Sequence, residues 1–333
     1  MFEVALRGRG FSDEASRLMT ASVRPESSGK NYNYSVKIFM DWCANLSPPV
    51  DPFTAPITTV ANFLAWVHSS RDLGQSAVAS FRSAISKVHI GYNGIPIGKS
   101  GAISNLIKGI GNLDPIRRSR RPRYTDTWDL APVLDALACM HPPQSLSLME
   151  LSIKTLALVA LATISRASTL FLLSRDFSYS HNEEEDVLSQ LFIKFIPGSR
   201  EKTDTGRLGL FIPALSEEES LDPVLYLAAY RDRSSQGGVF TQGEENSLWL
   251  STKKPHPPVK TVTLASWLKK AMEKGGVDTG IYKAHTIRAA VPAHLRKTKS
   301  LSLVQILARG GWKASSDGKS RTFIKFYERT AHS

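Results

Sequence analysis

The stretch LSLMELSIKTLALVALATISR, residues 146–166, decides the fold of the larger part of this chain. Its residues are apolar on nearly every side of a helix, which is typical of a helix buried at the centre of a domain. Its longest apolar run, LALVALATI at 156–164, is too short for the roughly 18 residues of a membrane span. We therefore expect a buried helix followed by Arg166, whose charge needs an anionic or hydrogen-bonding partner.

The segments that follow predict a small antiparallel sheet. SQLFIKFIP (189–197) and GRLGLFIPAL (206–215) are strand-like, and the polar segment GSREKTDT between them predicts a hairpin turn. NSLWLS (246–251) is a candidate further strand. Helices are expected around this sheet, at the sequences TWDLAPVLDALACM, TLASWLKKAMEK, HTIRAAVPAHLRK and LSLVQILAR and in a last segment ending TFIKFYERT.

The part of the chain before residue 116 predicts a small domain of four amphipathic helices. The first spans residues 31–47, and turns rich in Gly, Pro or Ser separate the four. Their apolar residues, spaced by three and four, are Val36, Phe39, Met40 and Cys43; Val60, Phe63, Leu64 and Val67; Val78, Phe81 and Ile85; and Ile103, Leu106, Ile107 and Ile110. We expect domains at 1–115 and 125–333, joined by a linker at 116–124.

Composition indicates a folded protein with an anionic partner. The chain has 333 residues, 42% of them hydrophobic, and 42 Lys and Arg against 30 Asp and Glu give a net charge of +12. Residues 1–123 hold 16 of these cations against 8 acids, so the first domain is the more basic. Such an excess favours a polyanion or an anionic membrane surface as partner. The N-terminus lacks a cleavable signal pattern, so we expect an intracellular protein.

The positive charge is densest in IRRSRRPR, residues 116–123. A run of this kind can be a solvated linker, a nuclear-import signal, or a segment that crosses a phosphate backbone. These alternatives stay open here. The candidate DNA-binding residues are Arg117, Arg118, Arg120, Arg121 and Arg123.

Several kinds of site have no support in the sequence. The two cysteines form no C-x-x-C pair and the eight histidines are scattered, so we expect no metal site. GIPIGKS (94–100) has one residue too few for a phosphate-binding loop and no strand leads into it, so we interpret it as a turn. No nucleophile elbow or H-E-x-x-H is present. We expect no cofactor and no bound nucleotide.

What remains is a set of cations and one tyrosine spread along the second domain. KAHTIRAA (283–290) puts His285 and Arg288 at a spacing that shares one helical face. Taken singly, each residue of the set has an ordinary structural explanation, such as a buried ion pair, a solvated turn or a packed ring. The set is Arg166, Lys202, His285, Arg288, Trp312 and Tyr327.

In this order, the set resembles the catalytic pattern of the tyrosine recombinases, or phage-integrase-like enzymes. The pattern is Arg, a Lys in a β-hairpin, H-x-x-R, a Gly-Gly-Trp, and a tyrosine near the C-terminus. The resemblance implies a mainly α fold with a small antiparallel sheet, in which a four-helix (SAM-like) core-binding domain precedes an α+β catalytic domain. Three segments look like the tyrosine recombinases carried by eukaryotic mobile elements of the DIRS and Crypton kind. They are YNYSVKIFMDWC, RPRYTDTWDLAPVLDAL and GGW…TFIKFYER.

The resemblance also implies a role for each residue. Arg166 and Arg288 would bind the scissile phosphate through their planar forks of donors. Tyr327 would be the nucleophile that forms a 3′-phosphotyrosyl link. Lys202 would protonate the leaving 5′-hydroxyl. His285 would handle the tyrosine proton and a phosphate contact, and Trp312 would donate its indole N–H or support the pocket.

Four features differ from the family pattern or leave an assignment open. Thr169 stands where the family often has an acid, three residues after Arg166. KASSDGKSRTFIKF, between Trp312 and Tyr327, is longer than expected, so cleavage in cis or in trans stays open. Only ERTAHS follows Tyr327, so we expect the C-terminal helix that many relatives exchange between subunits to be absent or very short, and how a tetramer is held stays open. Lys194, in the preceding strand, is an alternative to Lys202 as the hairpin lysine.

The function implied is a metal-independent site-specific recombinase or integrase, acting as a homotetramer on two double-stranded DNA sites and serving a mobile element. It would be nuclear if the host is eukaryotic, and no membrane is involved. Two alternatives are a domesticated DNA-binding protein that no longer cleaves and a type IB topoisomerase. The sequence leaves open the target site, the host and whether the enzyme is active.

Overall fold

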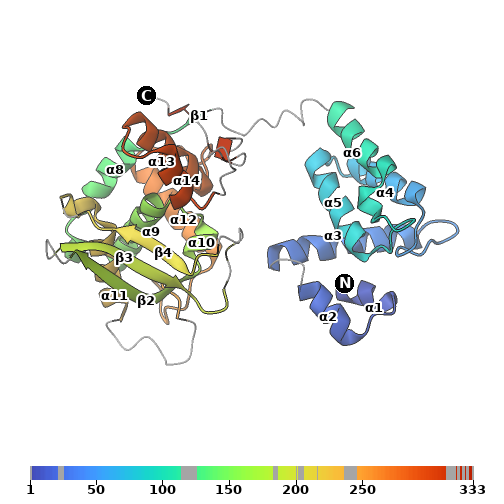
Figure 1. Cartoon of the computed structure of the whole chain (residues 1–333), viewed down its shortest axis with the longest axis horizontal. Coiled ribbons are helices and arrows are strands. Elements are labelled where there is room, and N and C mark those ends of the chain that lie inside the picture. Colours follow the sequence, from blue (N-terminus) through green and yellow to red (C-terminus); the bar gives the residue numbers. More distant parts are fainter. Residues whose placement is uncertain are drawn as a thin grey trace. The chain divides into compact units, whose positions relative to one another are not determined.

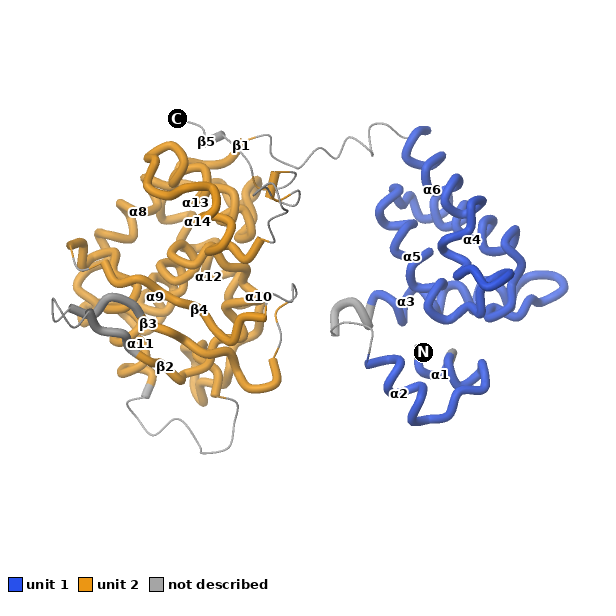
Figure 2. The backbone as a smooth tube through the Cα atoms, viewed as in Figure 1, with its two compact units in different colours: residues 1–123 blue, residues 124–333 orange. Residues whose placement is uncertain are grey.

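The structure is a computed structural model in which the chain forms two compact units, residues 1–123 and 124–333 (Figure 2). It describes residues 2–21, 26–113, 126–182, 187–199, 201, 206–215, 217–235, 246–312, 320, 323–324, 327 and 330–331. The expected linker at 116–124 lies outside these ranges. None of the helices within them combines the length and the hydropathy that a bilayer crossing needs.

The first unit is helical (Figure 1). Its elements are α1 (Phe2–Gly8), α2 (Asp13–Ala21), α3 (Glu26–Ala44), α4 (Ile57–Ser70), α5 (Gln75–Val88), η1 (Ile97–Lys99) and α6 (Gly101–Leu113). The four helices expected from the spacing of apolar residues are α3 to α6. GIPIGKS, interpreted as a turn, contributes η1 between α5 and α6.

The core of the first unit consists of the residues whose spacing predicted the helices. The α4 positions Val60, Phe63, Leu64 and Val67 are at most 1% exposed, and Phe63 packs 4.9 Å from Phe39 of α3 between ring centres. Met40 and Leu106 are only half-buried at its margin. The sequence did not predict α1 and α2. These short helices are fixed by tertiary packing, since Leu6 of α1 is fully buried against residues of α3 and α5.

The second unit is built around α9 (Leu148–Thr163), the helix predicted to be central. Ser147 and Glu150 form a capping box at its start, and every residue from 151 to 160 is buried. Even Lys154 is fully buried, because its Nζ donates to the carbonyl of Met140 at 2.6 Å. The helix contacts α11 (Pro223–Ser235), α12 (Thr261–Lys274) and strand β4 (Gly209–Pro213).

The sheet has three strands, in the order β2 (Leu173–Asn182), β3 (Val187–Phe195) and β4, all antiparallel. The predicted hairpin corresponds to β3 and β4, in which Leu191 pairs with Ile212 and Ile193 with Leu210. One expectation needs correction, since NSLWLS forms isolated bridges with Ser174 and Pro258 rather than a strand of the sheet. The sequence analysis also missed β2, whose residues are largely polar.

The remaining elements include α13 (Ile287–Lys297), which carries Arg288 next to the end of α9. The remaining elements are β1 (Asp126–Thr127), α8 (Ala131–Ala138), η2 (Pro143–Ser145), α10 (Ala167–Leu170), η3 (Glu219–Leu221), η4 (Ala284–Thr286), α13 (Ile287–Lys297), α14 (Leu303–Arg309) and β5 (Thr330–Ala331). In the final segment Phe323 and Ile324 are helical, whereas Thr330, expected to end a helix, lies in β5 and pairs with β1. The expectation of a mainly helical fold with a small antiparallel sheet is confirmed.

Candidate active site

The end of α9 forms the floor of the candidate site. Ile164 ends the helix in the left-handed conformation, with φ 51°, and is fully buried. The chain therefore turns sharply, and Arg166 becomes the N-cap residue of the short helix α10. Arg166 is half-exposed. Its position directly after a buried helix is the one that the sequence predicted.

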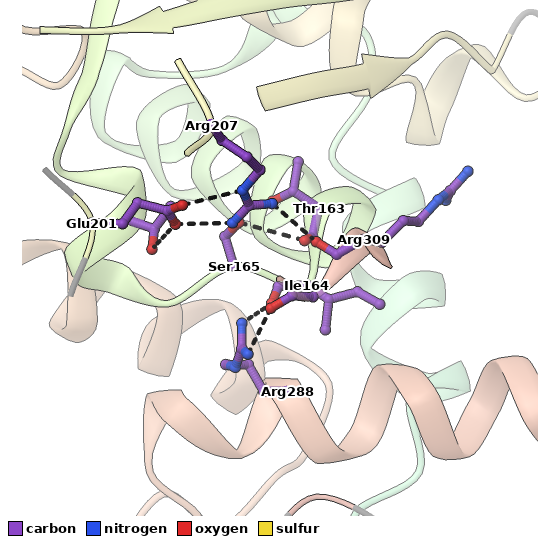
Figure 3. Close-up of polar contacts among 9 residues, drawn as sticks. Thr163, Ile164, Ser165, Glu201, Arg207, Arg288 and Arg309 are labelled. Atoms are coloured by element: carbon purple, nitrogen blue, oxygen red, sulfur yellow. Dashed lines mark hydrogen bonds and ion pairs between the residues drawn. The ribbon is translucent and has the colours of Figure 1, made fainter. Parts of the chain in front are cut away.

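Arg288, on α13, ties this turn to the end of α14. Its side chain is 2% exposed. Nη1 donates to the carbonyl of Ile164 at 2.5 Å and Nη2 donates to the carbonyl of Gly310 at 2.8 Å. Figure 3 shows the guanidinium directed at the end of α9. The planar fork of donors thus binds two segments that are 146 positions apart in the chain, from Ile164 to Gly310.

The Gly-Gly-Trp sequence has a steric basis. The Trp312 ring folds back over Gly310, so that a Cβ there would lie 1.9 Å from a ring carbon. Gly311 adopts φ +64°, which other residues rarely do. Trp312 is 6% exposed and packs edge-on against Phe323 with ring centres 4.9 Å apart. The two glycines therefore let the indole lie against the site.

The aromatic rings cover the guanidinium of Arg288. Its carbon Cζ is 4.2 Å from the centre of the Trp312 ring and 5.2 Å from that of Tyr327. The two rings are 5.1 Å apart. Both distances to the cation lie within the range of a cation–π contact. The structure thus brings the predicted nucleophile, the second arginine and the tryptophan together.

Positive charge accumulates at the same place. Burial lowers the pKa of Arg288 to about 10, and the neighbouring charges of Arg166 and then Arg207 lower it too, while Tyr327 acts in the opposite direction. Arg288 still carries its charge at neutral pH. Two buried donors, Nε of Arg288 and Nε1 of Trp312, have no hydrogen-bond partner among the described residues. The charges of Arg166 and Arg288 together with these two donors are suited to an anion.

The two residues of H-x-x-R differ in their accessibility. His285 lies in the short turn η4 and is exposed, whereas Arg288 lies in α13 and is buried. The other predicted residues lie elsewhere. Lys194 is exposed on β3 between the buried Ile193 and Phe195, which fits a side chain that points to solvent. Lys202 and the arginines Arg117, Arg118, Arg120, Arg121 and Arg123 lie outside the described residues.

Sequence reasoning missed two residues beside the site, Glu201 and Arg207. Their side chains form an ion pair, with Arg207 Nη2 2.9 Å from Glu201 Oε1 (Figure 3). Glu201 lies within the predicted turn segment GSREKTDT and Arg207 lies just after it; in this region only Lys202 was singled out. The alternating charges of REKTDTGR were a usable signal, since opposite charges that flank a hairpin turn can pair. No cluster of three or more His, Cys, Asp or Glu side chains that could hold a metal ion occurs within the described part of the chain.

Known structures share this fold, although no protein-family model and no curated protein matches the sequence. XerH site-specific recombinase in a pre-cleavage complex with difH substrate superposes with a TM-score of 0.55 and 13% identity, over 89% of this chain and 78% of that one. Its post-cleavage complex with palindromic difH gives 0.54 and 10%, over 89% and 76%. A lambda integrase tetramer bound to a Holliday junction gives 0.50 and 16%, over 92% and 77%. The chain therefore has the tyrosine-recombinase fold.

Proposed function

We propose that this protein is a site-specific DNA recombinase or integrase that cuts and rejoins double-stranded DNA through a 3′-phosphotyrosyl intermediate. The observation that carries the proposal is the position of Tyr327, whose ring centre lies 5.2 Å from Cζ of Arg288. Besides burial, the positive charge of Arg166 lowers the pKa of Arg288, so a second cation acts at the same place. The fold shared with XerH recombinase and lambda integrase supports it. A nucleophile beside guanidinium groups is what attack on a phosphodiester requires.

In the proposed reaction, the Tyr327 hydroxyl oxygen attacks the scissile phosphorus in line with the 5′ oxygen. The tyrosine–phosphorus bond forms as the bond from phosphorus to the 5′ oxygen breaks. His285 takes the tyrosine proton, and Lys202 gives a proton to the leaving 5′ oxygen. Arg166 and Arg288 neutralise the charge that grows on the two non-bridging oxygens. Attack by a 5′-hydroxyl reverses the step, so that no bond energy is lost.

The burial of Arg288 adds a conformational requirement. Its guanidinium is covered by Trp312 and Tyr327, and two of its nitrogens donate to main-chain carbonyls. A phosphate therefore reaches Arg288 only when the rings shift. In the proposal, DNA takes the place of the Tyr327 ring over the cation, and the indole Nε1 of Trp312 gains an acceptor.

The remaining parts of the proposal concern binding and biology. The basic unit 1–123 and the arginine run at 116–123 would contact DNA phosphates on either side of the cleavage site. Two DNA sites would be held by a homotetramer. Integration or excision of a mobile element is the proposed role, with nuclear action if the host is eukaryotic.

Trapping of the covalent adduct tests this function. A nicked duplex made from the DNA flanking the gene loses a short 5′-hydroxyl fragment by diffusion after cleavage, so the reverse step is blocked. Wild-type protein should then give a protein–DNA band that is stable to SDS. Tyr327→Phe removes one oxygen and little volume, so it should bind DNA and give no band.

Each other outcome of the trapping experiment contradicts a part of the proposal. A band that persists with Tyr327→Phe identifies another nucleophile. If wild-type protein binds these sites and never forms the band, the protein binds DNA without cutting it. Relaxation of supercoiled plasmid without recombination between two sites would make it a topoisomerase.

A further inference from the structure

A buried carboxylate lies at the edge of the arginine group. The side chain of Glu201, between β3 and β4, is 6% exposed. Its two oxygens accept from Arg207, with Nη2 at 2.9 Å and Nε at 3.1 Å, so the pair is bidentate (Figure 3). Oε1 also accepts from the hydroxyl of Thr169 at 3.0 Å. One carboxylate thus joins two elements at once.

These contacts extend to the segments that carry the candidate active-site residues. Thr169 is buried in α10, the four-residue helix whose N-cap is Arg166, so a bond to Thr169 restrains the turn of Arg166. Arg207 lies against the glycine turn before Trp312: its Nη1 is 3.5 Å from the carbonyl of Arg309. Its Nη2 would be 2.7 Å from a Cβ on Gly311, which is closer than a real side chain allows.

We propose that Glu201 is a positioning residue of the cleavage site, which holds the Arg166 turn and, through Arg207, the turn that precedes Trp312. The proposal rests on the proposed function. A buried ion pair adds little net stability compared with apolar side chains. A bidentate arginine–carboxylate pair has a defined geometry, however, and so restrains the groups that it joins. Glu201 also supplies negative charge next to Arg207, whose positive charge acts on Arg288.

Glu201→Gln tests the proposal with a small change in shape. Glutamine keeps one acceptor for Thr169 or Arg207 and loses the charge and the bidentate pair. At saturating nicked DNA, the rate of adduct formation should fall by roughly tenfold to a hundredfold, because small displacements of reacting groups have effects of that size. The DNA dissociation constant should stay within about twofold, since the phosphate contacts that dominate affinity lie along the whole site. Glu219→Gln, which removes an exposed carboxylate beyond β4, is the control with the same change in charge.

Thr169→Val separates positioning from a general loss of structure. It removes only the hydroxyl that links α10 to Glu201 and leaves the ion pair in place. Adduct formation should be slower than in wild type, and the double variant Thr169→Val/Glu201→Gln should be no slower than Glu201→Gln alone. If the rate of the double variant is instead reduced by the product of the two single reductions, the two residues act independently, and the link through Thr169 is wrong. If Glu201→Gln fails to fold, the rate with Thr169→Val decides alone, and an unchanged rate overturns the proposal.

The result for wild-type protein distinguishes this inference from the proposed function. If wild type forms the adduct and Glu201→Gln forms it at the same rate, only the role of Glu201 is wrong. If Glu201→Gln lowers the DNA affinity and the melting temperature along with the rate of adduct formation, Glu201 is a purely structural residue, and the inference is also overturned. If wild type forms no adduct while it binds the DNA, both fail together.

Discussion

Arg288 and Trp312 form a stacked pair in which the guanidinium carbon lies 4.2 Å from the centre of the indole ring. Arg288 is 2% exposed and Trp312 is 6% exposed, so the contact is shielded from water. Cation–π contacts are stronger where they are desolvated. The indole therefore both covers the cation and offers its own N–H beside it.

The Trp312 ring should stabilise the second unit through this stack. Trp312→Ala leaves a cavity over Arg288 and should lower the free energy of unfolding by about 3 to 5 kcal/mol. Trp312→Phe should lower it much less, because a phenyl ring still lies over the cation and the lost indole N–H has no partner among the described residues. Urea unfolding of both variants measures the difference. Equal losses would show that the stack contributes nothing.

Arg288→Lys should affect both stability and cleavage. The ammonium keeps the charge but cannot donate to the carbonyls of Ile164 and Gly310 together, and each charge-assisted bond contributes about 1.5 to 3 kcal/mol. We expect a lower melting temperature, DNA binding near that of wild type at a temperature where the variant is folded, and little adduct. Arg296→Lys, on the exposed end of the same helix, is the matched control. A normal rate of adduct formation with Arg288→Lys would remove Arg288 from the phosphate site.

His89 should make the first unit sensitive to acid. The residue is 5% exposed, its Nδ1 accepts from the Gly91 N–H at 2.9 Å, and the other ring nitrogen, Nε2, therefore carries the proton and donates to the Ala55 carbonyl at 2.8 Å. Burial is the main cause that lowers its pKa. A second proton on the ring would have to displace the bond from Gly91. The neutral ring is therefore the form that the fold accommodates.

The sign follows from the lowered pKa. At pH values between the folded pKa of His89 and the unfolded pKa of about 6.5, the unfolded state binds more protons than the folded state. The contribution of His89 to stability is therefore fully present above about pH 6.5 and is lost as the pH falls towards the folded pKa. His89→Gln keeps a donor for Ala55 and does not titrate. From pH 7.5 to pH 5, calorimetry should show a larger loss of stability in wild type than in His89→Gln, by at most about 1.4 kcal/mol per pH unit. Identical pH dependences would contradict the assignment.

The helices were predictable where burial follows a simple period. In α4 the spacing of the apolar residues indicated which face is buried, and in α9 the nearly all-round apolar pattern indicated a buried helix. Strand β2 was not predictable in this way, since LSRDFSYSHN has too few apolar residues to show a period. Its place is fixed by pairing with β3, which is a tertiary interaction.

The site was predictable only in part, for a related reason. The order of motifs predicted Arg166, Arg288, Trp312 and Tyr327 as site residues. The structure places the last three in mutual contact, and Arg166 lies two residues after Ile164, to which Arg288 donates. Spacing alone suggested that His285 and Arg288 share one face, but η4 interrupts the regular helix and the two differ in exposure. The ion pair of Glu201 with Arg207 depends on how the strands around a turn meet α10, which no local pattern records.

The arginine run before the second unit should set the salt dependence of DNA binding. Each phosphate that a cation neutralises adds about 0.9 to the slope of log K against log salt concentration, so replacement of Arg117, Arg118, Arg120 and Arg121 by Ser should flatten the slope by up to roughly 3 to 4 units. Replacement of the same four residues by Lys keeps the charge and should keep the slope, which separates charge from the shape of the side chain. Titrations by fluorescence anisotropy at several salt concentrations give both values. The arginine run is also suited to nuclear import. An unchanged slope in the Ser variant would therefore mean that the run is a linker or an import signal. The DNA contacts of the first domain would then have to come from its helices.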